Sequence, residues 1–136
     1  MRKSLRTLSP SRASVALFAA YWVVACAVCS MQLVAGDLEP SGVALQLLVP
    51  IAAGGVMGFA GAPIAIGIVA GAVFGALDFV VLVTIYLRQA PASARSFPGL
   101  EGLLVPPAVF GAIGAGLGLV GAFGGRVLNA RRAIQR

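Results

Sequence analysis

One carboxylate, Asp78, stands alone in a long apolar tract. It is the only charged side chain between Pro40 and Leu87. An ionised carboxylate near the centre of a bilayer costs roughly 2.5 to 3.5 kcal/mol on insertion scales, so such residues usually have a structural or functional role. Because no basic side chain lies within the apolar segments to pair with it, we expect Asp78 to be protonated near neutral pH.

A protonated carboxyl needs a hydrogen-bond acceptor, and Pro50 provides a candidate. A proline inside a helix lacks the N–H that normally binds the carbonyl four residues earlier, here that of Gln46. We therefore predict an intramembrane polar site in which Asp78 contacts the Gln46 side chain or its carbonyl. Two alternatives stay open, because such a carboxyl can also contact another protein's helix or bind a proton or cation.

Cys26 and Cys29 form a CxxC pair on one face of an apolar segment. In a soluble loop this spacing would suggest redox chemistry or half of a zinc site. The chain contains no His and no second cysteine pair, so we expect no metal site. Two small buried cysteines are the favoured interpretation. A thiol relay facing the outer leaflet is the alternative.

The composition sets the class of protein. Of 136 residues, 60% are hydrophobic and 10% are charged, whereas soluble domains are about 25% charged. The absence of His excludes imidazole-ligated haem and zinc and any His general base. We predict no catalytic residues, no cofactor and a lipid bilayer as the solvent.

The apolar residues divide into membrane-spanning lengths. A single helix over residues 40–87 would measure about 70 Å, more than twice the roughly 30 Å hydrocarbon core. The tract must therefore fold back, and Gly61 to Pro63 is the best turn. We predict an all-α, polytopic integral membrane protein forming one membrane domain over residues 1–136. Its four helices are predicted at about 13–35, 42–60, 63–87 and 103–128.

The charges predict the orientation. The net charge of +6 comes from basic residues gathered in two tails, 1–12 and 126–136, with two further arginines in the loop 88–102. The excess of basic residues at both ends favours cytoplasmic termini. We expect a multi-pass protein of the cell (inner or plasma) membrane and no nucleic-acid partner.

The first segment has two alternative interpretations. A secretory signal peptide ending near Ala35 is one, and a lipoprotein signal with Cys26 as the acylated residue is the other. The apolar run is long for a signal peptide, and three more hydrophobic segments follow it. An uncleaved helix is therefore favoured.

Glycines recur at helical spacing. Gly67, Gly71 and Gly75 lie within about 80° of one another around a helix, and Asp78 falls at about 20° in the same stripe. In lipid, helices associate by close backbone approach through small residues. The spacing predicts a compact glycine-packed bundle. The ten predicted packing glycines are Gly54, Gly58, Gly67, Gly71, Gly75, Gly111, Gly114, Gly118, Gly121 and Gly125.

Two stretches resemble a known family. AIGAGLGLVGAFGGRVLNARR resembles the glycine-rich helix and basic loop of the F-type ATP synthase rotor-ring subunit, and GALDFVVLV resembles its carboxylate helix. In that family the glycine-rich helix comes first, whereas here it follows Asp78. The resemblance therefore implies only that glycine grooves beside one Asp suit tight helix packing.

The functional prediction follows from these features. We expect a small non-enzymatic membrane protein, a subunit or assembly factor that docks on larger membrane proteins through glycine-lined helix faces or associates with itself. The alternative is a homo-oligomeric transporter or channel in which Asp78 is a proton or cation site.

Overall fold

The structure, a computed structural model, describes residues 11–36, 39–89 and 100–135. Within these ranges the only regular secondary structure is helical, and each of its four helices is long and apolar enough to cross a membrane. This confirms the prediction of an all-helical chain with four candidate membrane spans. The helices are α1 (Arg12–Ala35), α2 (Pro40–Phe59), α3 (Ile64–Gln89) and α4 (Leu100–Ile134).

The ends of α1 and α2 follow from local sequence. The Ser11 hydroxyl accepts a hydrogen bond from the Ser14 N–H at 3.2 Å and caps the start of α1, which satisfies one of the free donors of its first turn. Gly36, with φ of 74°, ends the same helix. Pro40 begins α2, two residues before the predicted start, because proline is well suited to the first helical position.

The fourth helix is longer than predicted. It ends at Ile134 rather than near residue 128, so most of the predicted basic tail 126–136 is helical. The reason is composition, since no glycine or proline follows Gly125 and Ala, Leu and Arg are strong helix formers. At about 1.5 Å per residue, α4 is longer than the hydrocarbon core of a bilayer is thick.

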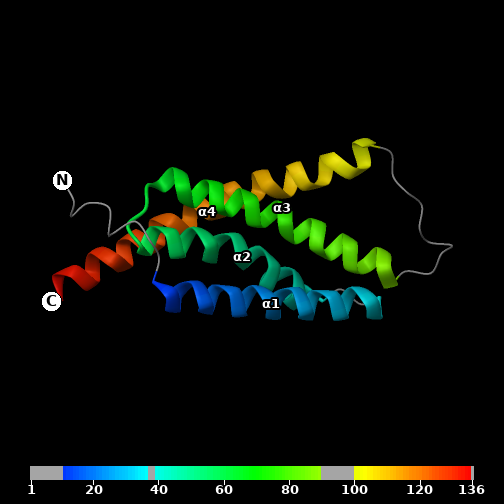
Figure 1. The fold of residues 1–136 in the computed structure, drawn as a ribbon, viewed down its shortest axis with the longest axis horizontal. Helices are drawn as coiled ribbons and strands as arrows, with labels where there is room; N and C mark the ends of the chain where they lie inside the picture. Colours follow the sequence, from blue (N-terminus) through cyan, green and yellow to red (C-terminus); the bar gives the residue numbers. More distant parts are fainter. Residues whose placement is uncertain (1–10, 37–38, 90–99, 136) are drawn as a thin grey trace.

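The chain folds back between α2 and α3 at the predicted turn. Gly61 has φ of 79°, a left-handed conformation that glycine adopts without steric cost. Pro63 immediately precedes the first residue of α3. As a result, the α2–α3 turn, the start of α1 and the end of α4 lie at the same end of the molecule (Figure 1). We call this the arginine end, because Arg12, Arg126, Arg131 and Arg132 belong to the helix ends that meet there.

Helices α2 and α3 form the middle of the assembly. Both of them contact α4, and both contact α1, whereas within the described residues α1 and α4 make no contact with each other. The α2–α3 pair therefore separates α1 from α4 (Figure 1).

Glycines lie where α4 meets its two neighbours. A Cβ added at Gly71 of α3 would lie 2.6 Å from the Cα of Gly118. On the other side, a Cβ added at Gly121 would lie 2.8 Å from the backbone nitrogen of Gly55 in α2. Such distances exclude any side chain while the backbones keep these positions. All ten glycines named from the sequence are buried, and a Cβ at any of them would come within 4 Å of another helix of this chain.

Helix α1 is attached differently. Only Ala25 and Cys29 of this helix are buried. The Phe18 and Trp22 rings meet the Phe74 ring of α3 edge to face, with centroids 4.8 and 5.2 Å apart. Aromatic and polar side chains of α1 therefore make most of its contacts, including that of Gln32 with the buried Gly42 of α2.

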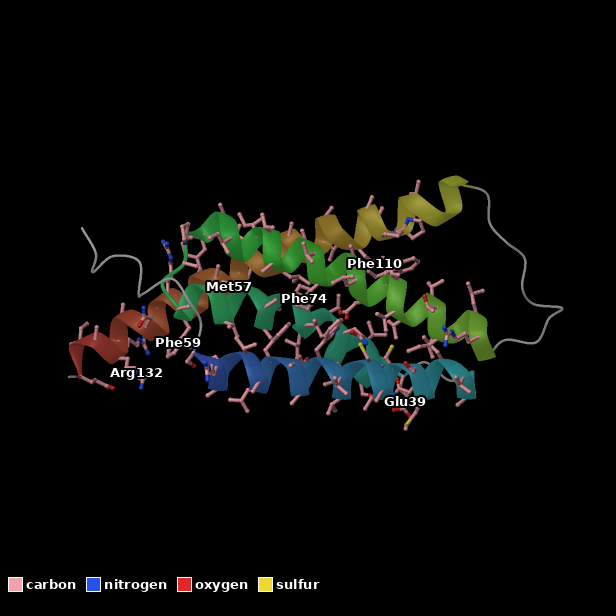
Figure 2. All side chains as sticks on the ribbon, viewed as in Figure 1. Glu39, Met57, Phe59, Phe74, Phe110 and Arg132 are labelled. Atoms are coloured by element: carbon pink, nitrogen blue, oxygen red, sulfur yellow. The ribbon has the colours of Figure 1, made fainter. Side chains whose placement is uncertain are left out.

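The outer surface of the helices is apolar. Large hydrophobic side chains project from all of them (Figure 2). Leu17 and Met31 of α1 are each 72% exposed, and Val120 of α4 is 61% exposed. A surface of this kind suits lipid as the surrounding solvent.

Candidate functional site

The Asp78 carboxylate lies inside the helix assembly, with only 5% of the residue exposed. Its hydrogen-bond donors come from α1. The indole N–H of Trp22 donates to Asp78 Oδ1, and the Cys26 sulfur lies 3.9 Å from the same oxygen. Trp22 and Cys26 are four residues apart, so they occupy one face of α1. Asp78 is therefore a link between α3 and α1.

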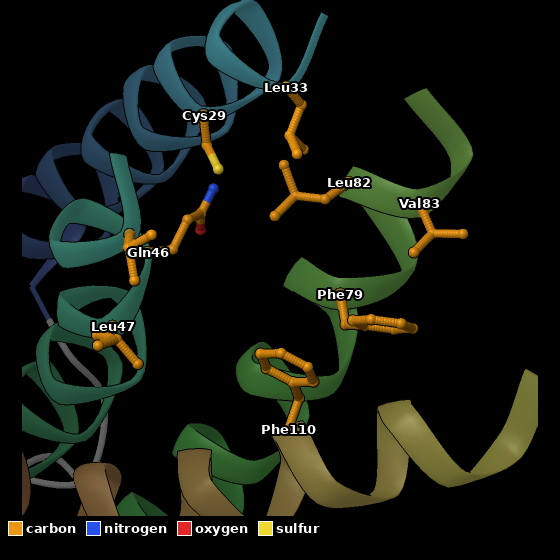
Figure 3. A pocket seen from close by; sticks show the side chains of 9 residues that line it. Cys29, Leu33, Gln46, Leu47, Phe79, Leu82, Val83 and Phe110 are labelled. Carbon is orange, nitrogen blue, oxygen red and sulfur yellow. The ribbon is translucent and has the colours of Figure 1, made fainter. Parts of the chain in front are cut away.

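The hydrogen bonds of Asp78 go to α1 rather than to Gln46 of α2. The Gln46 amide makes no hydrogen bond to the carboxylate, and both its nitrogen and its oxygen are buried without a hydrogen-bond partner among the described residues. Figure 3 shows the amide of Gln46 pointing toward the sulfur of Cys29. The prediction assumed that a protonated Asp78 would donate a hydrogen bond to an acceptor on α2. In the structure, Asp78 Oδ1 instead accepts from the Trp22 N–H and faces the Cys26 S–H.

A signal for the true partner was present in the sequence. Trp22 lies in the middle of an apolar segment, away from the interfaces where membrane tryptophans gather. A buried indole N–H usually finds an acceptor. Asp78 is the one carboxylate inside the apolar segments, so the two residues were a natural pair.

Pro50 is buried on α2, and a tyrosine contacts the backbone near it. The Tyr21 hydroxyl donates to the carbonyl of Leu45 at 2.6 Å, one residue before the carbonyl that Pro50 was predicted to free. Pro50, Gln46 and Asp78 all line one cavity of about 90 Å³. The three predicted residues are therefore neighbours around a small space, although no hydrogen bond joins them.

The two cysteines have different surroundings. Cys26 is half-buried next to Asp78. Cys29 is 4% exposed and lies beside the Gln46 amide (Figure 3). Both thiols are free, and no group of three or more Cys, Asp or Glu side chains in the described ranges could hold a metal ion.

A larger apolar cavity opens beyond this cluster, toward the end opposite the arginines. Its volume is about 460 Å³. Phe79 of α3 and Phe110 of α4 form one wall, with ring centroids 4.9 Å apart and stacked. Figure 3 shows Gln46 and Cys29 as the polar side chains at its edge, among residues that are otherwise aliphatic or aromatic.

The arginine end has its own contacts. Arg126 donates from Nε and Nη2 to the carbonyl of Ala62, at 3.3 and 3.0 Å, and so joins α4 to the α2–α3 turn. The Arg132 guanidinium lies 5.8 Å from the centroid of the Phe59 ring, within the range of a cation–π contact.

The arrangement around Asp78 performs one clear task, the hydrogen bonding of α1 to α3. Comparison with known proteins adds no function, because no protein family, no curated protein and no solved structure matches this chain.

Proposed function

We propose that this chain is a small non-enzymatic subunit or accessory factor of the cell membrane, which docks on a larger membrane protein. In this proposal the four helices cross the bilayer as one bundle, with both termini in the cytoplasm. The close glycine contacts of α4 with α2 and α3 support the bundle, and the arginines at the end shared by the first and last helices support the orientation.

The docking face must differ from the one suggested by the sequence. The ten packing glycines meet helices of the same chain, so they are not free for a partner. Gly116 of α4 is exposed, and a Cβ there would meet nothing within 4 Å. We define the α4 outer face as the exposed residues that share the side of Gly116 at helical spacing, namely Val105, Val109, Ala112, Gly116, Val120, Phe123 and Val127.

The observation that carries the proposal is the unused glycine in this face. Ala112 and Gly116 are four residues apart, the small-xxx-small spacing through which membrane helices approach closely. Elsewhere in α4 the buried glycines contact another helix. A helix from a larger membrane protein would complete the same kind of contact at Gly116.

The test compares two variants in which a small, exposed helix residue is replaced by leucine. The full chain and its Gly116→Leu variant are purified in mild detergent and analysed by quantitative mass spectrometry. One larger membrane protein should be recovered stoichiometrically with the wild type, with recovery falling at least about tenfold in the variant, which corresponds to 1.4 kcal/mol of binding.

The matched control is Ala19→Leu, at an exposed position of α1, which should leave recovery unchanged. Purification of the wild-type chain alone, or as a homo-oligomer, would contradict the proposal, as would equal recovery with Gly116→Leu.

The second candidate is the homo-oligomeric transporter or channel that uses Asp78. The cavity of about 90 Å³ beside the carboxylate favours it, since such a space is large enough for water. Against it, Asp78 is 5% exposed and bonded to α1, so a site between subunits would require α1 to move. A pH- or cation-dependent flux in proteoliposomes that Asp78→Asn abolishes would establish this candidate in place of the first.

A further inference from the structure

A groove lies between α1 and α4 at the arginine end. It has a volume of about 520 Å³ and forms where these two helices, which do not touch, both flank α2. Ser14 of α1, Phe59 of α2 and Leu128 of α4 line its end nearest the arginines, which we call its mouth, and Ile51 lines it farther along α2. From Phe59 to Ile51 the groove follows α2 for about 12 Å at 1.5 Å per residue. The groove is open on one side and lined mainly by apolar residues, and we call it the apolar channel.

Positive charge gathers at the mouth of this groove. The Arg132 guanidinium lies over the ring of Phe59, which itself lines the groove, as Figure 2 shows at the end of the bundle. Arg12 is two residues before Ser14, and Arg131 and Arg132 are exposed near the end of α4. Among the acidic side chains that the structure describes, none lies at this end, because Glu39 directly precedes α2 at the far end (Figure 2) and Asp78 lies near the middle of α3.

The depth of the groove mouth matches a lipid head group. Helix α2 has 20 residues, which at about 1.5 Å each equal the roughly 30 Å of hydrocarbon. Phe59 is its last residue. If α2 spans the hydrocarbon from end to end, as proposed above, Phe59 is at its edge, and the Arg132 guanidinium, 5.8 Å from the centroid of that ring, is at about the depth of lipid phosphates.

We propose that the groove and the arginines together bind an anionic phospholipid, with one acyl chain along the apolar channel and the phosphate on Arg132, Arg131 and Arg12. The apolar lining of the groove suits an acyl chain. The arginines, which have no acidic side chain near them among the described residues, suit a negatively charged head group. A transmembrane helix of a partner would fill the channel but leave the arginines without a counter-charge. The groove borders the α4 outer face at Val120, but the arginines lie outside that face, and the two proposals are tested by different variants and different readouts.

The experiment measures lipid retained on the full chain by native mass spectrometry in a mild detergent. Phosphatidylglycerol and phosphatidylcholine with identical acyl chains are added in equal amounts. We expect at least about fivefold more bound phosphatidylglycerol, because each arginine near a membrane surface contributes measurable attraction to anionic lipid. The double variant Arg131→Gln/Arg132→Gln should reduce this preference to within about twofold.

A second variant tests the groove itself. Gly124 lines the groove, and a Cβ there would meet nothing within 4 Å, so Gly124→Leu should fold while its side chain occupies the channel. We expect it to reduce retention of both lipids. Ala19→Leu, at an exposed position of α1 outside the groove, and Arg88→Gln, at the far end of α3, are the matched controls and should leave the retention of both lipids unchanged.

Three results would overturn the inference. The first is equal retention of the two lipids by the wild type. The second is an unchanged preference in the double arginine variant. The third is competition by glycerol 3-phosphate as effective as competition by phosphatidylglycerol, which would show that the arginines bind a soluble phosphate and that the groove has no role.

Discussion

At the scale of single residues, Asp78 shows how a carboxylate is accommodated among apolar helices. Its described partners are the Trp22 N–H and the Cys26 thiol, both from α1. A hydrogen bond to an indole lessens the cost of burying the carboxyl while it joins two helices. The residue that stood out in the sequence as a candidate for chemistry thus forms a contact between α1 and α3 in the structure.

The first prediction concerns this contact. A double-mutant cycle with Trp22→Phe and Asp78→Ala should give a coupling free energy of about 0.6 to 1.7 kcal/mol, the range for hydrogen bonds between membrane helices. Phenylalanine keeps a ring against Phe74 and removes only the N–H donor. The measurement is reversible unfolding in mixed micelles.

Its control is the cycle of Tyr21→Phe with Asp78→Ala. The Tyr21 hydroxyl donates to the Leu45 carbonyl rather than to Asp78, so the coupling free energy should be close to zero. Equal coupling in both cycles would show that the Trp22 bond has no special part in holding α1.

The second prediction concerns glycine contacts. Gly71→Ala should lower the free energy of unfolding by about 1 to 3 kcal/mol, the usual cost of overpacking, because the new Cβ would lie 2.6 Å from the Gly118 Cα. Gly116→Ala meets nothing within 4 Å and should leave stability unchanged or raise it by about 0.5 to 1 kcal/mol. Equal effects of the two changes on unfolding would contradict the assigned packing.

At the scale of helices, two kinds of contact coexist. Helix α4 meets α2 and α3 through backbone at glycines, where any side chain would force the helices apart. Helix α1 meets α2 and α3 through long side chains, including Phe18, Trp22 and Tyr21. Side chains can change rotamer while backbones in contact cannot, so α1 is the helix whose attachment adjusts most readily.

A third prediction tests the attachment of α1. Phe74→Ala removes both edge-to-face ring pairs between α3 and α1, each contributing about 0.5 to 1.5 kcal/mol. Opening of α1 should become more frequent, and alkylation of Cys29, now 4% exposed, should accelerate at least about threefold. The rate is followed by mass spectrometry in detergent.

The control for α1 is Phe123→Ala, which truncates an aromatic ring that is 54% exposed on α4. Alkylation of Cys29 should then proceed at the wild-type rate. A Phe74→Ala variant that reacts no faster than this control would show that the ring pairs do not hold α1.

At the scale of the whole molecule, the charge is distributed unequally between the two ends. Arg12, Arg126, Arg131 and Arg132 share one end, where the guanidinium of Arg126 also binds the α2–α3 turn. Such an end resists transfer across a membrane. Three of these arginines, Arg12, Arg131 and Arg132, thus serve both the proposed orientation and the proposed lipid site.

The fourth prediction follows from this asymmetry. In a background with Cys26→Ala and Cys29→Ala, single cysteines at Ser11 and Asn129 should react with an impermeant maleimide from the cytoplasmic side only. A cysteine at Glu39, at the start of α2, should react only from the opposite side. Labelling of Ser11→Cys and Asn129→Cys from opposite sides would refute the bundle with paired termini.

The sequence by itself determined the four helices and the turn between the second and the third. These are local properties, because about 20 apolar residues in succession satisfy their backbone hydrogen bonds only as a helix in lipid. It also identified Asp78 as exceptional and the ten glycines as small residues at helical spacing. The extension of α4 beyond residue 128 could also have been predicted, because no glycine or proline follows Gly125.

Only the tertiary structure decided which faces meet. Trp22 and Asp78 are 56 residues apart in the chain, and their pairing depends on the rotation and depth of two helices relative to each other. The division of the α4 glycines between α2 and α3 depends on the same rotations. Periodicity shows which residues share a face of one helix, but it does not show which residues of another helix that face will meet. The sequence therefore suggested Gln46 as the hydrogen-bond partner of Asp78, whereas Trp22 donates to it in the structure.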